Sequence, residues 1–440
     1  MRDRYRLIRR AAAASLAAAV GVVGYAPSAM AGRAGLALPA TVTASPADTP
    51  ELNPTGTAEQ VRQIVQCGGT MYAVGTFTSI RHNSTVYSRN RVFSFSATAP
   101  YDVTSWNPDV NGRVNTIGFN GSNCADAYIG GKFTSVHGTA ATNIAEISTS
   151  TGAVVAGFGH TANGEVETIA SSHGHLLVGG HFTSVNGSAD KYFVSVSPAT
   201  GKDDGYLHLN ISGNYGSGST QVYNQQISHS GALELAEGTF TSVGGQHRQQ
   251  IFMLSLGSTS ATVTGWTSPE FNQACVQKES FYVRAASWSP SDSTVYIATT
   301  GFHPASGIGS VRTGLCDAAA AFPATQTSVS DIWINYTGCD SLYSTAADSD
   351  TAYFGGHERW ADNAHGCNNA GPGAVSAPGM VGLSPTTGAV VFNPTRARGF
   401  GADDMLMTSA GLWIASDNFH NASQCAGKSG HAGICFLPNG

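Results

Sequence analysis

The fold of this chain is decided by the stretch Ile129-Gly130-Gly131-Lys132-Phe133-Thr134-Ser135-Val136, because close copies of it recur. Three copies lie in Tyr72–Ile80, Val178–Val185 and Ala236–Val243, each with Gly, a variable residue, Phe, Thr and Ser in that order. Their phenylalanines (Phe77, Phe133, Phe182 and Phe240) follow one another at 56, 49 and 58 residues. Self-similarity at a fixed period of this size is typical of repeat architectures, in which each unit covers the apolar side of the next.

Each repeat contains four short apolar segments separated by turn residues, which predicts a four-stranded β-sheet blade. Weaker copies occur at Tyr296–Ala298, Tyr353–Gly356 and Trp413–Ala415. Seven such units predict an all-β, seven-bladed β-propeller. The seventh unit lacks an outer strand, and Glu51–Gly56 is similar to segments near blade ends. We therefore expect this N-terminal segment to join the last blade and close the ring, because an open sheet edge leaves backbone groups unpaired.

The N-terminus has the order of a secretory signal: five Arg within the first ten residues, an apolar run from Ala11 to about Tyr25, and Ala29-Met30-Ala31 as a cleavage site. A run of about 15 apolar residues is too short to span a bilayer. Arg9-Arg10 leaves twin-arginine export open beside the general secretory route. We expect residues 1–31 to be a signal peptide that is removed, 32–49 a flexible linker and 50–440 the propeller domain of a secreted, extracellular protein.

Charge and cysteine content agree with export. Removing residues 1–31, which hold five Arg and one Asp, changes the formal net charge from −6 to −10, and no basic patch remains to suit nucleic acid. Eight cysteines in an oxidising compartment predict disulfides. Spacing alone leaves the connectivity open, but Cys67 and Cys124 occupy matching places in neighbouring units, which favours their pairing. Cys425 with Cys435 could close the seventh-unit loop and Cys339 with Cys367 could anchor the sixth, which leaves Cys275 with Cys316.

The repeat resembles those of secreted actinobacterial β-propeller proteins and is broadly similar in shape to WD and kelch propellers, although the Trp-Asp signature of WD repeats is missing. The resemblance covers about residues 50–440, specifically in the first four units and weakly in the last three. It implies fold and secretion. It carries no active-site motif onto this chain.

Departures from the repeat are where function is usually added. Long loops follow the signature position in the sixth and seventh units, and they gather aromatic, amide and charged side chains that suit a sugar ring. The predicted ligand-binding residues are His357, Glu358, Arg359, Trp360, Asp362, Asn418, Phe419 and His420. The same residues are equally consistent with loops that are simply held by disulfides.

Two other places could carry a ligand. The residue before the signature Phe varies between units and could line one face, although such residues are more often simply solvated; these residues are Thr76, Lys132, His181, Thr239, Gly301, His357 and Asn418. The axial channel of a propeller is the second place, into which Arg62, Glu167 and Arg284 could project.

The motifs of known chemistries are weak. The histidines lack zinc-site spacing, so we expect no metal cofactor, with a structural Ca²⁺ near Asp348 and Asp350 as an open alternative. Catalytic residues stay unknown because spacing selects no pair among the available carboxylates. The favoured function is an exported recognition module, a monomer that binds a glycan or a surface protein. The alternatives are a secreted polysaccharide hydrolase or lyase and a purely structural surface protein.

Overall fold

The structure is a computed structural model in which residues 42–53, 55, 58–216, 218–273, 275, 282–301, 315–394, 401–418, 425–426 and 431–440 are described. Two units divide the chain, residues 1–37 and 38–440, and every described residue belongs to the second. This unit is all-β, as predicted, apart from a short 3₁₀ helix at Pro269–Asn272. Within the described ranges, no helix has the length and apolarity needed to cross a membrane.

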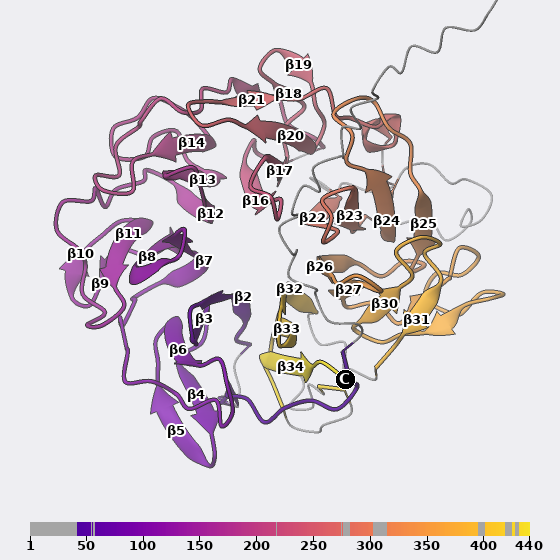
Figure 1. The fold of residues 1–440 in the computed structure, drawn as a ribbon, viewed down its shortest axis with the longest axis horizontal. Coiled ribbons are helices and arrows are strands. Elements are labelled where there is room, and N and C mark those ends of the chain that lie inside the picture. Colours follow the sequence, from indigo (N-terminus) through magenta and orange to yellow (C-terminus); the bar gives the residue numbers. More distant parts are fainter. Residues whose placement is uncertain are drawn as a thin grey trace, which may run out of the picture. The chain divides into compact units, whose positions relative to one another are not determined.

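Seven antiparallel sheets, here numbered 1 to 7 in chain order, share one plan of an inner hairpin followed by one or two outer strands (Figure 1). Sheets 1 to 3 are β2 (Val61–Cys67), β3 (Thr70–Gly75) and β6 (Val92–Ser96); β7 (Arg113–Asn120), β8 (Asn123–Lys132) and β11 (Ile144–Ser148); β12 (Glu165–Ser172), β13 (His175–His181) and β14 (Phe193–Val196). Sheets 4 and 5 are β16 (Val222–Ile227), β17 (Leu233–Gly238), β20 (Ile251–Leu256) and β21 (Ala261–Val263); β22 (Val283–Trp288), β23 (Thr294–Thr299), β24 (Ala318–Pro323) and β25 (Trp333–Tyr336). Sheets 6 and 7 are β26 (Leu342–Ala347), β27 (Ala352–Gly356), β30 (Val381–Leu383) and β31 (Val390–Phe392); β32 (Ala402–Thr408), β33 (Gly411–Ser416) and β34 (Ile434–Pro438).

Shorter strands form small sheets beside the seven. They are β1 (Glu51–Leu52), β4 (Ser79–His82), β5 (Thr85–Ser88), β9 (Ser135–Val136), β10 (Thr139–Ala140), β15 (Ile211–Ser212), β18 (Ser242–Val243), β19 (Gln246–His247), β28 (Trp360–Ala361) and β29 (Val375–Ser376). Strands β4, β9 and β18 begin at the Ser of the repeated Phe-Thr-Ser motif. The motif therefore ends the inner hairpin and starts a small one.

The repeated motif is a scaffold element. Its phenylalanines are at most 2% exposed, and a Cβ added at Gly131 or Gly180 would overlap the carbonyl oxygen of the facing strand. The Thr and Ser of the motif lie in a turn. The backbone nitrogens of this turn donate hydrogen bonds to a side chain in the segment before the inner hairpin. In sheet 2, for example, Asn111 Oδ1 accepts hydrogen bonds from the backbone nitrogens of Thr134 and Ser135, both at 2.9 Å. In sheet 2 the motif is thus held to the segment just before its own inner hairpin through local hydrogen bonds.

The hydrophobic core consists of seven clusters, each between two successive sheets. Val74 and Ile129 belong to the cluster between sheets 1 and 2, and the series continues in order around the molecule. The last cluster joins sheet 7 to sheet 1, because Trp413 packs with Phe95 at a ring-centroid distance of 5.7 Å. Figure 1 shows the inner strands β2, β7, β12, β16, β22, β26 and β32 around a common centre.

The N-terminal part of the described chain runs beside the last strand. Thr43 N donates to Pro438 O at 2.8 Å, and Ala47 N donates to Phe436 O at 3.0 Å. Residues 42–47 therefore pair with β34. The sequence predicted that these residues belong to a linker and that the later segment Glu51–Gly56 pairs with the last blade. The expected segment instead starts with β1, which pairs with β4 of the first unit, while Leu52 N donates to Ala432 O at 2.9 Å.

Disulfides join the eight cysteines in the four expected pairs. Cys67 lies at the end of β2 and Cys124 in β8, so this bond connects sheets 1 and 2. Cys425–Cys435 ties a loop of sheet 7 to β34. Four disulfides indicate an oxidising environment.

Candidate functional site

Each of the seven inner strands contains a register shift near its start, where one residue has no partner on the second strand. Such a β-bulge re-aims the side chain of the extra residue. The seven bulged residues, called the bulge ring below, are Arg62, Asn115, Glu167, Tyr223, Arg284, Tyr343 and Asp403. In each strand the residue before the bulge is apolar and buried, so the bulge separates a core position from a position facing the centre.

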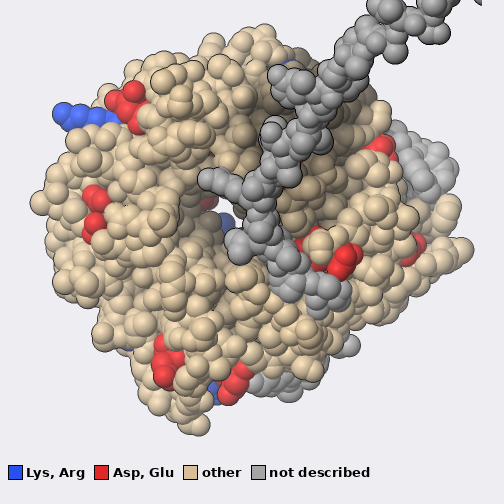
Figure 2. Space-filling view, in the orientation of Figure 1, with Lys and Arg blue, Asp and Glu red and all other residues tan. Residues whose placement is uncertain are grey.

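All seven members of the bulge ring line one cavity of about 240 Å³. Figure 2, which views the molecule in the orientation of Figure 1, shows a hollow near the centre of the visible face. A second cavity of about 410 Å³ begins where the first ends, since Gln63, Thr168, Gln226, Thr345 and Asp404 line both. The second cavity is more apolar and includes Ile117, Phe119 and Trp288. The centre of the protein is therefore hollow, polar at the bulge ring and apolar beyond it.

Hydrogen bonds between successive inner strands hold the bulge ring in place. Gln63 Oε1 accepts from Ile117 N at 2.7 Å, which ties β2 to β7, and Asp404 Oδ2 accepts from Ile64 N at 3.0 Å, which ties β32 to β2. The other junctions carry bonds of the same kind: Thr116 with Ile169, Gln225 with Thr168, Tyr223 with Val283, Ser287 with Thr345, and Ser344 with Ala402. Rigid elements therefore position the cavity side chains.

Two carboxyl groups of β12 meet beside the cavity. The amide nitrogen Nδ2 of Asn115 lies 2.8 Å from Glu165 Oε1 and 2.8 Å from Glu167 Oε2. Arg113 also donates to Glu165 Oε1. Burial opposes the ionisation of Glu165, but the hydrogen bonds from Arg113 and Asn115 outweigh it and lower the pKa of Glu165. Burial, together with the charge of Glu165, raises the pKa of Glu167 to about 7.

The opposite part of the bulge ring is aromatic and cationic. The Arg284 guanidinium lies 4.9 Å from the ring centroid of Tyr343, in cation–π contact. The hydroxyl of Tyr343 lies 2.9 Å from Nδ1 of His357, and the hydroxyl of Tyr223 donates to the carbonyl of Val283. Burial raises the pKa of both tyrosines. Both phenols therefore stay protonated at neutral pH and can act as hydrogen-bond donors.

The predicted residues of the sixth-unit loop lie in several environments. His357 reaches the bulge ring through Tyr343. Arg359 forms a two-pronged ion pair with Asp340, at 2.7 and 2.8 Å, and Asp362 accepts a 2.7 Å hydrogen bond from Asn335 Nδ2. The side chain of Glu358 is fully buried, whereas Trp360 is half-buried in β28. Arg359 and Asp362 thus anchor the loop, and the binding role of this set stays a prediction.

The predicted residues of the seventh-unit loop are described in part. Asn418 Oδ1 accepts from Glu59 N at 2.8 Å, so Asn418 ties this loop to the segment before β2. Phe419 and His420 lie outside the described residues.

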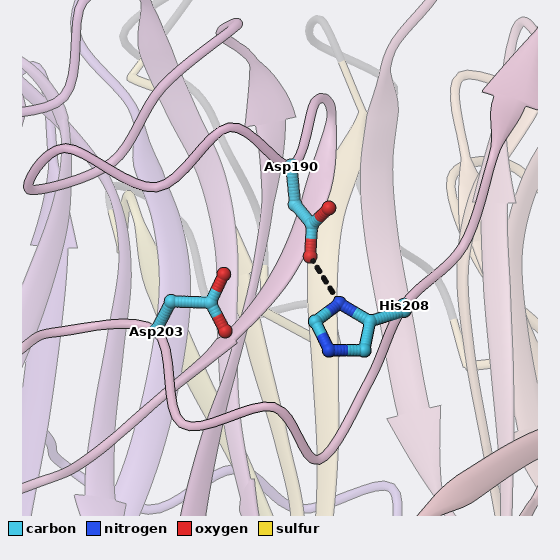
Figure 3. Close-up of side chains that lie close together, drawn as sticks. All are labelled: Asp190, Asp203 and His208. Carbon is cyan, nitrogen blue, oxygen red and sulfur yellow. Dashed lines mark hydrogen bonds and ion pairs between the residues drawn. The ribbon is translucent and has the colours of Figure 1, made fainter.

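Two clusters suggest cations but are explained by their own loops. Asp190 and His208 are hydrogen-bonded at 3.1 Å with Asp203 nearby (Figure 3). Asp203 accepts from Ser188 Oγ at 2.7 Å and from Gly205 N at 3.0 Å, which accounts for both of its oxygens.

At the alternative Ca²⁺ position near Asp348 and Asp350, the carboxylate oxygens of Asp348 are likewise hydrogen-bonded within their own loop. Asp348 Oδ1 accepts from the backbone nitrogens of Asp350 and Thr351, and Oδ2 accepts from the hydroxyl of Tyr353 at 2.7 Å. These contacts cap a turn, and Asp348 needs no ion for its hydrogen bonds.

The sequence pointed to three members of the bulge ring, Arg62, Glu167 and Arg284, and missed four. The missed residues are Asn115, Tyr223, Tyr343 and Asp403. A signal was present, because the residue after a repeated apolar position varies in type from unit to unit. Variation between units likewise suggested that the residue before the signature Phe lines one face. This residue lies at the far end of the second strand, and in two units, where it is Lys132 and His181, its side chain is exposed.

No family model matches the chain, and no curated protein matches its sequence. Among solved structures, the chain is similar to the computationally designed Ika8 protein, with a TM-score of 0.42 and 8% identity over 89% of this chain and 100% of that one. It is also similar to the WD40 β-propeller domain of Doa1, with a TM-score of 0.38 and 10% identity over 84% and 93% of the two chains. The described residues form an all-β arrangement of small antiparallel sheets.

Proposed function

We propose that this protein is an exported recognition module, a closed seven-bladed β-propeller that binds the end of a glycan in the cavity at its bulge ring. The bulge ring is the observation that carries the proposal. Seven separate strands each break their register to bring one polar or aromatic side chain to the same cavity. These seven side chains are of five types, Arg, Asn, Glu, Tyr and Asp, and a purely structural scaffold has no need for such variety at equivalent positions.

Seven blades and ring closure are supported by the seven inter-sheet clusters and by the N-terminal segment along β34. The hydrogen bonds of residues 42–47 with β34 supply the outer strand that sheet 7 otherwise lacks. Export is supported by the four disulfides and by the signal-like sequence of residues 1–31. The proposed protein is a secreted monomer, and its repeat resembles those of the secreted propeller proteins described above.

A sugar fits the chemistry of the bulge ring. Sugar hydroxyls take directional hydrogen bonds from amide, carboxylate and guanidinium groups, while the apolar face of the ring packs on aromatic side chains. Asn115, Glu167 and Arg284 supply the first kind of contact, and Tyr223 and Tyr343 supply the second. The terminal sugar of a chain would enter the cavity of about 240 Å³ at the bulge ring, which continues into the more apolar cavity of about 410 Å³.

We expect Arg284→Ala to weaken binding of the preferred glycan by about 10- to 100-fold, because a hydrogen bond from a charged group contributes about 1.5–3 kcal/mol. Glycan-array screening of the wild-type protein identifies the probe, and isothermal titration calorimetry measures its affinity. Lys132→Ala, an exposed change outside the cavity, is the matched control. Unchanged affinity of Arg284→Ala with loss on Trp360→Ala would move the site to the sixth-unit loop, and a wild-type protein that binds no glycan would overturn the proposal.

A further inference from the structure

Glu165 and Glu167 stand two residues apart on β12, and a β-bulge between Val166 and Thr168 brings both carboxyl groups to one amide. Asn115 Nδ2 donates a hydrogen bond to one oxygen of each carboxyl group. Both bound oxygens lie 2.8 Å from one nitrogen, so they are at most 5.6 Å apart. This bound is below the separation of about 6.5–9.5 Å typical of glycosidases that invert configuration and admits the separation of about 5–5.5 Å typical of those that retain it.

The two carboxyl groups differ in their surroundings. Glu165 Oε1 accepts hydrogen bonds from Asn115 and from two nitrogens of Arg113, which stabilises a carboxylate. Glu167 accepts one hydrogen bond from Asn115 and lies in the cavity lining. Within the described ranges, no hydrogen bond is made to Glu165 Oε2 or Glu167 Oε1, so each group keeps one oxygen for a ligand. Neighbouring acids in such unlike environments take different protonation states, the condition for a nucleophile beside a general acid.

We propose that Glu165 and Glu167 form the nucleophile and the general acid of a retaining glycoside hydrolase site at the edge of the bulge-ring cavity, where Glu167 is in the lining and Glu165 lies beside it on the shared Asn115. The inference rests on the proposed function, because a glycan must first bind there. The oxygen of Glu165 attacks the anomeric carbon, the glycosidic C–O bond breaks, and the departing oxygen takes the proton of Glu167. Water then attacks the glycosyl ester, Glu167 takes a proton from that water, and the ester bond to Glu165 breaks to regenerate both carboxyl groups.

The surrounding charges suit these roles. Arg113 and Asn115 on β7 keep Glu165 ionised, whereas Glu167 is faced by the charge of Glu165 on its own strand and by Arg62 on β2 and Arg113 on β7. Burial and Glu165 raise the pKa of Glu167 to about 7 against the two arginines. Glu167 can therefore both give and take a proton near neutral pH. Once the glycosyl ester has neutralised Glu165, we expect the pKa of Glu167 to fall, which favours its second role as a base.

The test uses the full-length protein and the glycans that it binds on an array, with product anomers followed by NMR. We expect wild-type turnover with retained configuration, and we expect Glu165→Gln to abolish it. Glu167→Gln should slow cleavage of the natural glycan by about 10²- to 10⁴-fold. It should spare cleavage of the corresponding 2,4-dinitrophenyl glycoside, whose leaving group needs no proton. Glu146→Gln, which changes a glutamate outside the cavity that hydrogen-bonds Tyr128, is the matched control and should leave turnover unchanged.

Two further measurements distinguish loss of catalysis from loss of folding in these variants. Thermal unfolding must show the wild-type midpoint for both variants, and azide should restore turnover of the activated glycoside by Glu165→Ala as a glycosyl azide of inverted configuration. Bound glycan without turnover by the wild-type protein, or turnover unaffected by both glutamine variants, overturns this inference and leaves the proposed function intact. Failure to bind any glycan overturns both.

Discussion

Replacing Glu237 by glutamine is expected to stabilise the fold by about 5 kcal/mol at pH 9 and to remove most of the stability lost between pH 5 and 8. Glu237 is 0% exposed, and no other described residue hydrogen-bonds to either of its carboxylate oxygens. Burial raises its pKa from the ordinary value of 4.5 to about 8. Between these two values the folded protein keeps a proton that the unfolded chain has released, so stability falls as the pH rises.

The repeat itself identifies Glu237 as an exception. The six other sheets have small or apolar residues at the equivalent position: Val74, Gly130, Gly179, Ala298, Gly355 and Ala415. Glutamine has nearly the same volume as a protonated glutamate and is equally unsatisfied, so the comparison isolates ionisation.

The measurement for Glu237→Gln is urea unfolding at pH 5, 7 and 9. A residual slope should persist, because burial and the neighbouring Glu237 also raise the pKa of Glu234 well above its ordinary value. Asp102→Asn, at an exposed position, is the control and should reproduce the wild-type pH profile. Parallel pH profiles for wild type and Glu237→Gln would contradict the argument.

Leu52→Ala is expected to lower the free energy of unfolding by about 2–5 kcal/mol, the range for a buried leucine. Leu52 is 1% exposed and belongs to the cluster that joins sheet 7 to sheet 1, together with Val61 and Trp413. Its side chain packs on Gly433 so closely that a Cβ there would overlap it. The loss should be measured by denaturant unfolding, and it tests ring closure because Leu52 contacts both ends of the series of sheets.

Deletion of residues 1–50 extends this test. Removing the segment bound to β34 leaves the outer edge of sheet 7 unpaired, so we expect a larger loss of stability than for Leu52→Ala and a greater tendency to associate. Val86→Ala, at a side chain 55% exposed in β5, should change stability by less than about 0.5 kcal/mol. A deletion variant as stable as the wild-type protein would show that the segment does not close the ring.

The repeat in the sequence determined the strand content and the order of the first four units, because Gly-x-Phe-Thr-Ser recurs at the end of the inner hairpin in each of them, and weaker copies indicated the last three. It also favoured the Cys67–Cys124 pair through the matching places of these residues in neighbouring units, whereas the other three pairs came from loop closure and elimination. The segment beside β34 was assigned wrongly to Glu51–Gly56, since similarity to other strand ends says nothing about which edge a short segment will meet.

The tertiary structure completed the candidate site, of which the sequence had pointed to Arg62, Glu167 and Arg284. Alternation along a strand predicts two faces, and a one-residue bulge changes which side chain points to the centre without leaving a distinctive mark in the sequence. Arg62 and Tyr343 are 281 positions apart in the chain and line the same cavity because their strands are bulged at the same place. Local sequence thus determined each sheet, whereas the register between neighbouring strands, set by the packing of the whole circle, decided which residues share the cavity.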